Sequence, residues 1–140
     1  MFTVGQRAVV VDASVAVRFA EADPQWLARW GDWIGEGAML LAPAHFGHEV
    51  ANALLYSARL DPLAATAMVD RLYAVGLEVA DRGLAGLLRS IQLGSQHSLT
   101  VYDAAYLDLA IDVDGQLATL DRALARAATA EGVEVVGAEG

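Results

Sequence analysis

Four acidic side chains, widely separated along the chain, have the chemistry and the local setting expected of a divalent-metal site. Asp12 directly follows a short apolar run that is typical of a buried strand, and Asp121 directly follows another. Ligand sites in parallel sheets lie at the carboxyl ends of the strands, so both carboxylates are expected at one edge. Asp103 falls in the first turn of a predicted helix, and Glu49 lies within a longer helical stretch.

A bound cation would explain why these carboxylates gather. Carboxylates in one cleft raise one another's pKa values unless positive charge lies between them. Mg²⁺ prefers oxygen ligands, keeps several waters and often needs only a few carboxylates. Asp12, Asp103 and Asp121 also lie at predicted helix N-termini, whose partial positive charge favours anions. Since the sequence has no nucleophile-elbow motif, a metal-activated water is the simplest nucleophile.

Three of the four acids also have an ordinary structural explanation. Asp12 and Asp121 each stand between a strand and a helix, where an aspartate commonly caps the helix by accepting a backbone N–H. Asp103 follows Thr100 by three residues, which resembles the spacing of a capping box. Capping alone could therefore account for each of these residues taken singly.

Glu49 belongs to a polar face that borders the apolar face of its helix. His45, Glu49, Asn52 and Tyr56 share this face by helical spacing, and a solvated surface would also explain them. His48-Glu49 resembles the start of a zinc-protease motif, but Asn52 stands where the second histidine is required. The pattern thus disfavours zinc and leaves Glu49 as a candidate ligand for a harder ion.

Composition narrows the classes of function. The chain has 140 residues, which fits a single domain over 1–140. It has no cysteine, so disulfides, thiolate zinc sites and cysteine nucleophiles are excluded. All nine basic residues are arginines, and the formal charge is −9, which repels nucleic-acid phosphates at long range. No apolar run is long enough to span a membrane, so we expect a cytoplasmic protein with no membrane association.

Short apolar runs alternate with helical patterns along the chain. This alternation predicts a parallel sheet between two helical layers. Strands are expected at 8–11, 39–42, 77–80, 117–120 and 133–136. Helices are expected at 14–19, 24–35, 43–59, 62–76, 84–96, from about 100, and at 121–130.

Arginines near the predicted site are candidates for gripping a phosphate backbone. Arg18, Arg122 and Arg126 lie on the helices that follow Asp12 and Asp121, and a guanidinium can bind a phosphate through two hydrogen bonds. Ordinary surface arginines would have the same pattern.

A tryptophan stripe marks the second helix. Trp26, Trp30 and Trp33 recur at helical spacing and, with Leu27 and Ile34, predict one apolar face. Such a face usually belongs to the core, but tryptophan is also enriched where protein partners dock. A basic partner segment would suit the acidic chain.

The ordered set of acidic blocks resembles PIN-domain ribonucleases of the VapC toxin type, from type II toxin–antitoxin (VapBC) systems. The blocks are VVVDAS ending at Ser14, HEVANAL from His48, SLTVYDAAYL around Asp103, and ATLDRAL around Asp121. Each block alone is weakly specific, but all four occur in order and extend over most of the chain.

The resemblance implies a three-layer α/β/α domain with a short, mainly parallel five-stranded sheet, and a Mg²⁺- or Mn²⁺-dependent endoribonuclease. It also implies a VapB-like antitoxin partner, a homodimer, and tRNA or rRNA as substrate. Carried over by position, the metal-binding and catalytic acids are Asp12, Glu49, Asp103 and Asp121, with Ser14, Thr119 and Asn52 in support. The alternative is a catalytically weak PIN-fold module that only binds a partner.

Overall fold

The chain is built around five parallel strands. A computed structural model describes residues 6–137. The strands are β1 (Ala8–Val11), β2 (Met39–Ala42), β3 (Leu77–Val79), β4 (Gln116–Ala118) and β5 (Val135–Val136), in the order β3-β2-β1-β4-β5. The central β1 is buried along its whole length, as its unbroken valine run predicts for a strand covered on both faces. The predicted parallel α/β sheet is confirmed.

The strand order reverses at β1. This strand pairs with β2 on one side and with β4 on the other, and Val11 lies in register with Ala118. The chain leaves β1 toward β2 and β3, and it adds β4 and β5 on the opposite side. The carboxyl ends of β1 and β4 therefore lie side by side at a topological switch point, where open parallel sheets place their ligands.

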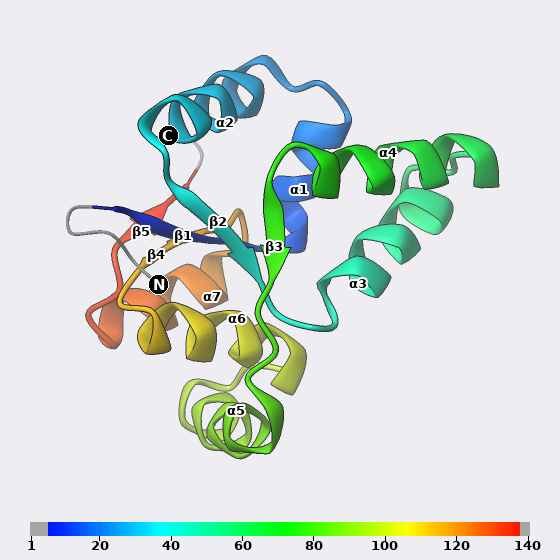
Figure 1. The fold of residues 1–140 in the computed structure, drawn as a ribbon. Helices are drawn as coiled ribbons and strands as arrows, with labels where there is room; N and C mark the ends of the chain where they lie inside the picture. The colour runs from blue at the N-terminus through cyan, green and yellow to red at the C-terminus, as the bar shows by residue number, and fades with distance from the viewer. Residues whose placement is uncertain (1–5, 138–140) are drawn as a thin grey trace.

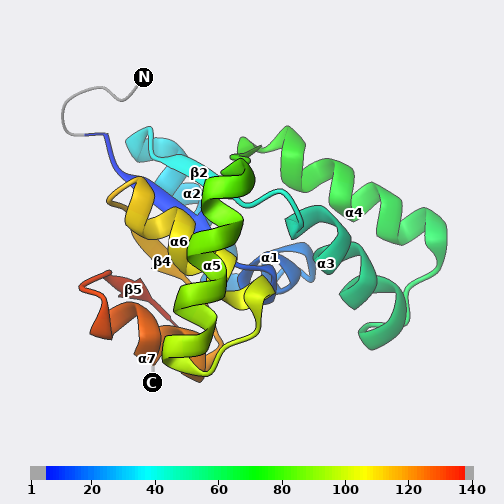
Figure 2. The same cartoon turned by 90° about the horizontal axis from the view of Figure 1, so that it is seen from below.

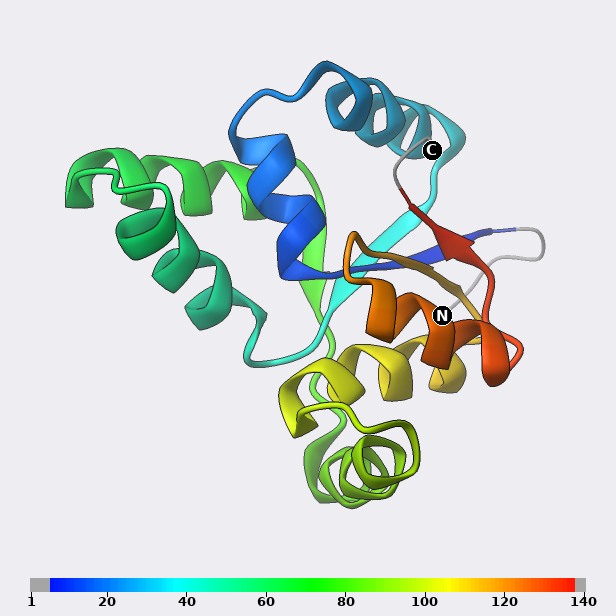
Figure 3. The ribbon, with the colours of Figure 1, turned by 180° about the vertical axis from the view of Figure 1, so that it is seen from behind.

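Helices cover both faces of the sheet, as the predicted three-layer architecture requires. One layer contains α1 (Ala13–Ala20), α2 (Pro24–Glu36), α3 (Phe46–Asn52) and α4 (Pro62–Ala74), and Figures 1 and 3 show it on one side of the strands. The other layer contains α5 (Gly83–His97), α6 (Val101–Asp112) and α7 (Arg122–Ala130). Figure 2 shows α5 lying outside α6, which separates it from the sheet.

The polar residues that punctuate the sequence begin the helices as predicted. The Asp12 side chain caps α1, and the Asp121 side chain caps α7 through the N–H groups of Ala123 and Leu124. Thr100 caps α6 by accepting the Asp103 N–H at 3.1 Å. Each cap satisfies backbone donors that have no partner inside the helix.

The single helix predicted over 43–59 is wrong in two respects. Pro43 begins a turn closed by a 3.0 Å hydrogen bond from the Phe46 N–H to the Pro43 carbonyl, and α3 starts only at Phe46. Beyond Asn52 the chain forms a π-helical segment, η1 (Ala53–Ser57), in which the Ala58 N–H donates to the Ala53 carbonyl. The wider π turn shifts the side-chain register, so the helical face predicted for Tyr56 does not continue past Asn52.

Strands β3, β4 and β5 are shorter than predicted. The apolar runs 77–80 and 117–120 continue past the last paired residues of β3 and β4, and the run 133–136 begins two residues before β5. Ala80, Leu120 and Val133 are apolar because they pack against the core outside the sheet. An apolar run indicates that residues are buried, not that they are paired in a strand, and here the buried residues extend beyond the paired ones.

The tryptophan stripe belongs to the core, which corrects the prediction of a partner contact. Trp26, Trp30 and Trp33 are 1%, 2% and 4% exposed, and the Trp30 ring stacks on Phe19 with centroids 4.1 Å apart. These rings leave no surface for a partner, because α2 turns them onto α1 and the sheet. The structure also corrects the apolar face, since Leu27 and Ile34 of the same helix remain exposed.

No helix within residues 6–137 is long and apolar enough to cross a membrane.

Candidate active site

Asp12 is a buried carboxylate at the carboxyl end of β1, held by two hydroxyl groups. Its Oδ1 accepts hydrogen bonds from the Ser14 N–H and the Ser14 Oγ, each at 2.5 Å. Its Oδ2 accepts one from the Thr119 Oγ1. The side chain is 5% exposed, and burial raises its pKa, whereas the hydrogen bonds from Ser14 and Thr119 lower it. The structure thus places both predicted supporting hydroxyls directly on Asp12.

The same hydroxyl groups join β1 to the segment after β4. The Leu120 N–H donates to Ser14 Oγ at 3.0 Å, and the Asp121 N–H donates to Thr119 Oγ1 at 3.0 Å. Because each hydroxyl accepts a backbone N–H, its own proton is directed to Asp12. The Asp121 Oδ1 caps α7 at 2.9 Å from the Ala123 N. Capping and a site role are compatible, since the cap uses one of the two carboxylate oxygens.

Glu49 reaches the site from α3 and is anchored by a tyrosine of α6. The Tyr106 hydroxyl donates to Glu49 Oε1 at 2.5 Å. Tyr106 is 1% exposed, and its pKa is strongly raised by burial and by the hydrogen bond to Glu49, so it remains a proton donor at working pH. The His45 Nε2 lies 3.8 Å from the same Glu49 oxygen, which is too long for a hydrogen bond.

Asp103 connects the remaining carboxylates electrostatically. Burial raises its pKa most, and the negative charges of Asp121 and Glu49 raise it further, while Thr100 and His45 lower it. Glu49 also raises the pKa of Asp12. The charges therefore link the four predicted acids in a series, with Glu49 acting on both Asp12 and Asp103, and Asp121 acting on Asp103.

The acidic group fits a hard divalent cation. Its donors are carboxylate oxygens, and none of the four acids forms an ion pair with an arginine among residues 6–137. The pKa values of Asp12 and Asp103 are raised mainly by burial, and the charges of neighbouring carboxylates raise them further. Within residues 6–137, no three histidine, aspartate or glutamate side chains lie close enough together to hold a metal ion between them. Mg²⁺ does not need three such ligands, because it usually binds through one or two carboxylates and several waters.

A shallow groove runs beside the acids. It is lined by His45, His48, Glu49, Asn52 and Tyr102. Asn52 is exposed there and makes no hydrogen bond to any acid within the described part of the chain.

The three candidate RNA-binding arginines differ in their positions. Arg122 directly follows Asp121, and Arg126 lies one turn further along α7; both are exposed. Arg18 lies in the last turn of α1, about 9 Å along the helix axis from Asp12. Its guanidinium pairs with Asp23 at 3.4 Å.

Sequence reasoning missed Tyr106 and the ring contacts of His45. Tyr106 lies three residues after Asp103 on α6, a spacing that places both on one side of a helix, and this spacing was the available signal. The contact with Glu49 joins two helices that are far apart in the sequence. His45 packs edge-on against Tyr106, with ring centroids 5.1 Å apart, and the sequence gives no signal for that contact.

Comparison with known proteins agrees with this architecture. A family model described as PIN domain matches residues 9–130. The curated protein Ribonuclease VapC3 from Pyrobaculum aerophilum is 39% identical over 82 residues, covering 56% of this chain and 63% of that protein. The match thus spans less than two thirds of the relative's length.

Solved structures share the fold. Protein PAE2754 from Pyrobaculum aerophilum aligns with a TM-score of 0.71 and 26% identity, covering 93% of this chain and 84% of that one. VapBC2 from Rickettsia felis, solved bound to a DNA fragment from its promoter, aligns with a TM-score of 0.73 over 94% of this chain and 99% of that one. Its 12% identity makes this second likeness one of fold alone.

Proposed function

Because the chain belongs to the PIN-domain family, we propose that it is a divalent-metal-dependent endoribonuclease and the toxin of a type II toxin–antitoxin pair. The observation that supports the proposal is that the charges of Asp12, Glu49, Asp103 and Asp121 act on one another in pairs, while none of these acids pairs with an arginine within residues 6–137. The curated relative named as a ribonuclease supports RNA as the substrate class.

Asp12, Glu49, Asp103 and Asp121 would hold the metal. Mg²⁺ or Mn²⁺, when bound, would lower the pKa of an attacking water and neutralise charge on the phosphate in the transition state. The hydroxyl protons of Ser14 and Thr119 favour the ionised form of Asp12, against the burial that raises its pKa, and they fix both of its oxygens. Tyr106 holds Glu49 through a short hydrogen bond and cannot itself act as a base, since its raised pKa keeps it protonated.

Asn52 and the α7 arginines complete the proposed substrate contacts. Asn52 lies in the groove beside Glu49, where its amide can bind substrate or ordered water. Arg122 and Arg126 are exposed on α7 and would contact RNA phosphates. Arg18, whose exposed guanidinium pairs with Asp23, would be a further contact more distant from Asp12.

The partner of the proposed toxin would be a VapB-like antitoxin, and the toxin itself would form a homodimer. The structural likeness to VapBC2, a toxin–antitoxin assembly by name, supports the antitoxin. tRNA or rRNA is the proposed substrate from family resemblance. A basic antitoxin segment would complement the charge of −9.

Cleavage of RNA tests the function directly. The purified chain is incubated with mixed small RNAs and Mg²⁺ or Mn²⁺, with and without EDTA, beside the variants Asp12→Asn, Asp103→Asn and the control Asp32→Asn on α2. We expect cleavage by the wild type and the control, and loss of cleavage with EDTA or either site variant.

Two results would contradict the proposal in different ways. Cleavage that survives chelation or both site substitutions would refute the metal site. Folded wild-type protein that cleaves no RNA under any condition would favour the partner-binding module instead.

A further inference from the structure

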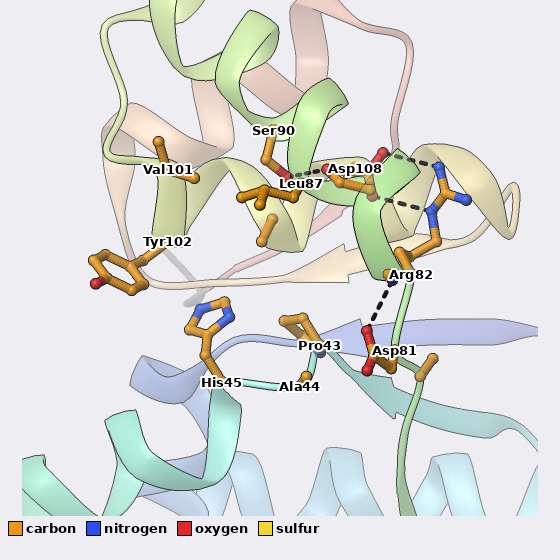
Figure 4. A pocket seen from close by; sticks show the side chains of 14 residues that line it. Pro43, Ala44, His45, Asp81, Arg82, Leu87, Ser90, Val101, Tyr102 and Asp108 are labelled. Atoms are coloured by element: carbon orange, nitrogen blue, oxygen red, sulfur yellow. Dashed lines mark hydrogen bonds and ion pairs between the residues drawn. The ribbon is translucent and has the colours of Figure 1, made fainter.

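A pocket beside the acidic group is not used by the chemistry described so far. It has a volume of about 260 Å³ and lies between the loop after β2 and helices α5 and α6. Figure 4 shows His45 and Tyr102 at one end, Leu87 and Ser90 along one wall, and Arg82 and Asp108 at the other end. Since drug-sized ligands occupy roughly 300 to 1,000 Å³, this pocket suits a smaller group, such as one ring system.

The pocket opens toward the proposed site of cleavage. His45 and Tyr102 line both this pocket and the groove that contains Glu49. Tyr102 precedes Asp103 on α6, and His45 lies one helical turn before Glu49. A group in the pocket would therefore be adjacent to a phosphate held at the acids.

The walls are suited to a flat, partly polar ring. Tyr102 is 66% exposed although it is a large aromatic residue, and its ring lies 5.5 Å from that of His45. The His45 ring also packs edge-on against Tyr106, with centroids 5.1 Å apart, which fixes its position at this end of the pocket. Leu87 and Val101 supply apolar surface, and both are exposed in the free chain.

The far end of the pocket is a fixed charged pair. Arg82 Nε and Nη2 donate to the two carboxylate oxygens of Asp108 at 3.1 and 3.2 Å. Arg82 Nη1 lies 3.4 Å from Asp112 Oδ1. With Asp108 only 3% exposed and neutralised by Arg82, this end does not repel a polar ring edge.

Because the chain is strongly negative, it needs a way to bind nucleic acid that does not depend on long-range attraction, and an aromatic pocket would provide one. A chain of charge −9 without lysine gains little from long-range attraction to phosphates. Stacking of bases on aromatic side chains does not depend on that attraction and contributes substantially to binding of single-stranded nucleic acid.

We propose that the pocket between His45, Tyr102 and Leu87 binds an unpaired nucleobase next to the scissile phosphate. Tyr102 stacks on the base, and the His45 ring forms the adjoining wall of the pocket. The assignment of this base to an RNA substrate rests on the proposed function, whereas its binding to the pocket does not.

Nucleosides test the pocket without metal, phosphate or cleavage. Adenosine, guanosine, cytidine and uridine are titrated at millimolar concentrations into ¹⁵N-labelled protein in EDTA, with ribose 5-phosphate as the probe that lacks a base. We expect at least one nucleoside to shift amide signals around Tyr102, His45 and Leu87, and ribose 5-phosphate to shift none of them.

Variants separate stacking from a general structural effect. Tyr102→Leu is expected to weaken nucleoside binding about tenfold, and Tyr102→Phe, which keeps the ring, to retain it. Ala105→Leu, which fills the pocket from α6, should also weaken binding. Tyr56→Leu, an equally exposed tyrosine outside the pocket, should not.

The pocket and the nuclease can fail separately. Absence of shifts with every nucleoside, equal shifts with ribose 5-phosphate, or unchanged binding by folded Tyr102→Leu would overturn the pocket proposal, even if the chain cleaves RNA. Nucleoside binding by a chain that cleaves no RNA would support the pocket and contradict the proposed function.

Discussion

At the scale of single residues, Asp12 combines a structural role with a role in the proposed site. It caps α1, and it is buried with its oxygens fixed by Ser14 and Thr119. Burial and the nearby charge of Glu49 make its ionised form costly to the folded chain. A residue selected only for capping would not need this setting, because an exposed aspartate caps a helix equally well.

Because the ionised form of Asp12 destabilises the folded chain, the Asp12→Asn variant is predicted to gain stability in a pH-dependent way. The pKa of Asp12 in the folded chain lies above its unfolded value of 3.8. Protonated Asp12 therefore favours the folded state below pH 3.8, and this contribution to stability is lost as the pH rises through the folded pKa. In EDTA at neutral pH we expect Asp12→Asn to melt at or above the wild-type temperature, with the difference shrinking in acid. Thermal melts followed by circular dichroism measure this, and a large destabilisation of Asp12→Asn at neutral pH would contradict it.

Tyr106 is a positioning residue that acts through Glu49. Tyr106→Phe removes the 2.5 Å hydrogen bond to Glu49 and leaves the ring packing in place. We expect the Mg²⁺ concentration for half-maximal cleavage to rise about tenfold or more, since partners that orient metal ligands commonly contribute that much. Tyr56→Phe, at an exposed tyrosine, is the matched control. An unchanged Mg²⁺ requirement would show that Tyr106 serves packing only.

At the scale of elements, the sequence predicted which strands and helices exist better than how they end. The change from an apolar run to a capping aspartate located the end of β1 and the starts of the helices that Asp12 and Asp121 cap, whereas β4 ends at Ala118, three residues before Asp121. It did not reveal η1, because a shift to hydrogen bonds five residues apart leaves no mark in side-chain spacing. The contacts of Tyr106 and His45 required the packing of α3 beside α6, which no local pattern encodes.

The packing of α5 on α6 depends on Gly86. We therefore expect alanine at this position to destabilise the chain, although helix propensity alone predicts that it would stabilise the helix. A Cβ at Gly86 would overlap the Arg82 Cβ and lie 3.1 Å from Asp108 Oδ2. Gly86→Ala should therefore destabilise the chain by about 1–3 kcal/mol through overpacking.

Gly31→Ala is the matched control for that substitution. Gly31 lies inside α2 with open space around its missing Cβ, so alanine there should stabilise by up to about 1 kcal/mol. Urea unfolding of both variants gives the comparison, and equal effects would contradict the close packing around Gly86.

For the whole molecule, the family resemblance predicted that the four acids belong to one site. Charge and composition alone did not identify a substrate. A formal charge of −9 opposes the approach of RNA at long range. Local contacts, with the exposed Arg122 and Arg126 near Asp121, must then provide the affinity.

This charge predicts an unusual salt dependence. With Mg²⁺ saturating, kcat/KM for RNA should stay level or rise as KCl increases, because screening weakens the overall repulsion. Nucleases that rely on many lysine and arginine contacts lose affinity steeply under the same change. A steep fall in kcat/KM with added KCl would contradict the importance of the net charge.

Mn²⁺ binding tests, without reference to any substrate, whether Asp12, Glu49, Asp103 and Asp121 bind a divalent ion. Electron paramagnetic resonance counts free Mn²⁺ during titration of the wild type, Asp103→Asn and the control Asp32→Asn. We predict a saturable site in the wild type and the control, with affinity reduced at least tenfold in Asp103→Asn. Equal binding by all three folded proteins, or no saturable binding by the wild type, would contradict it.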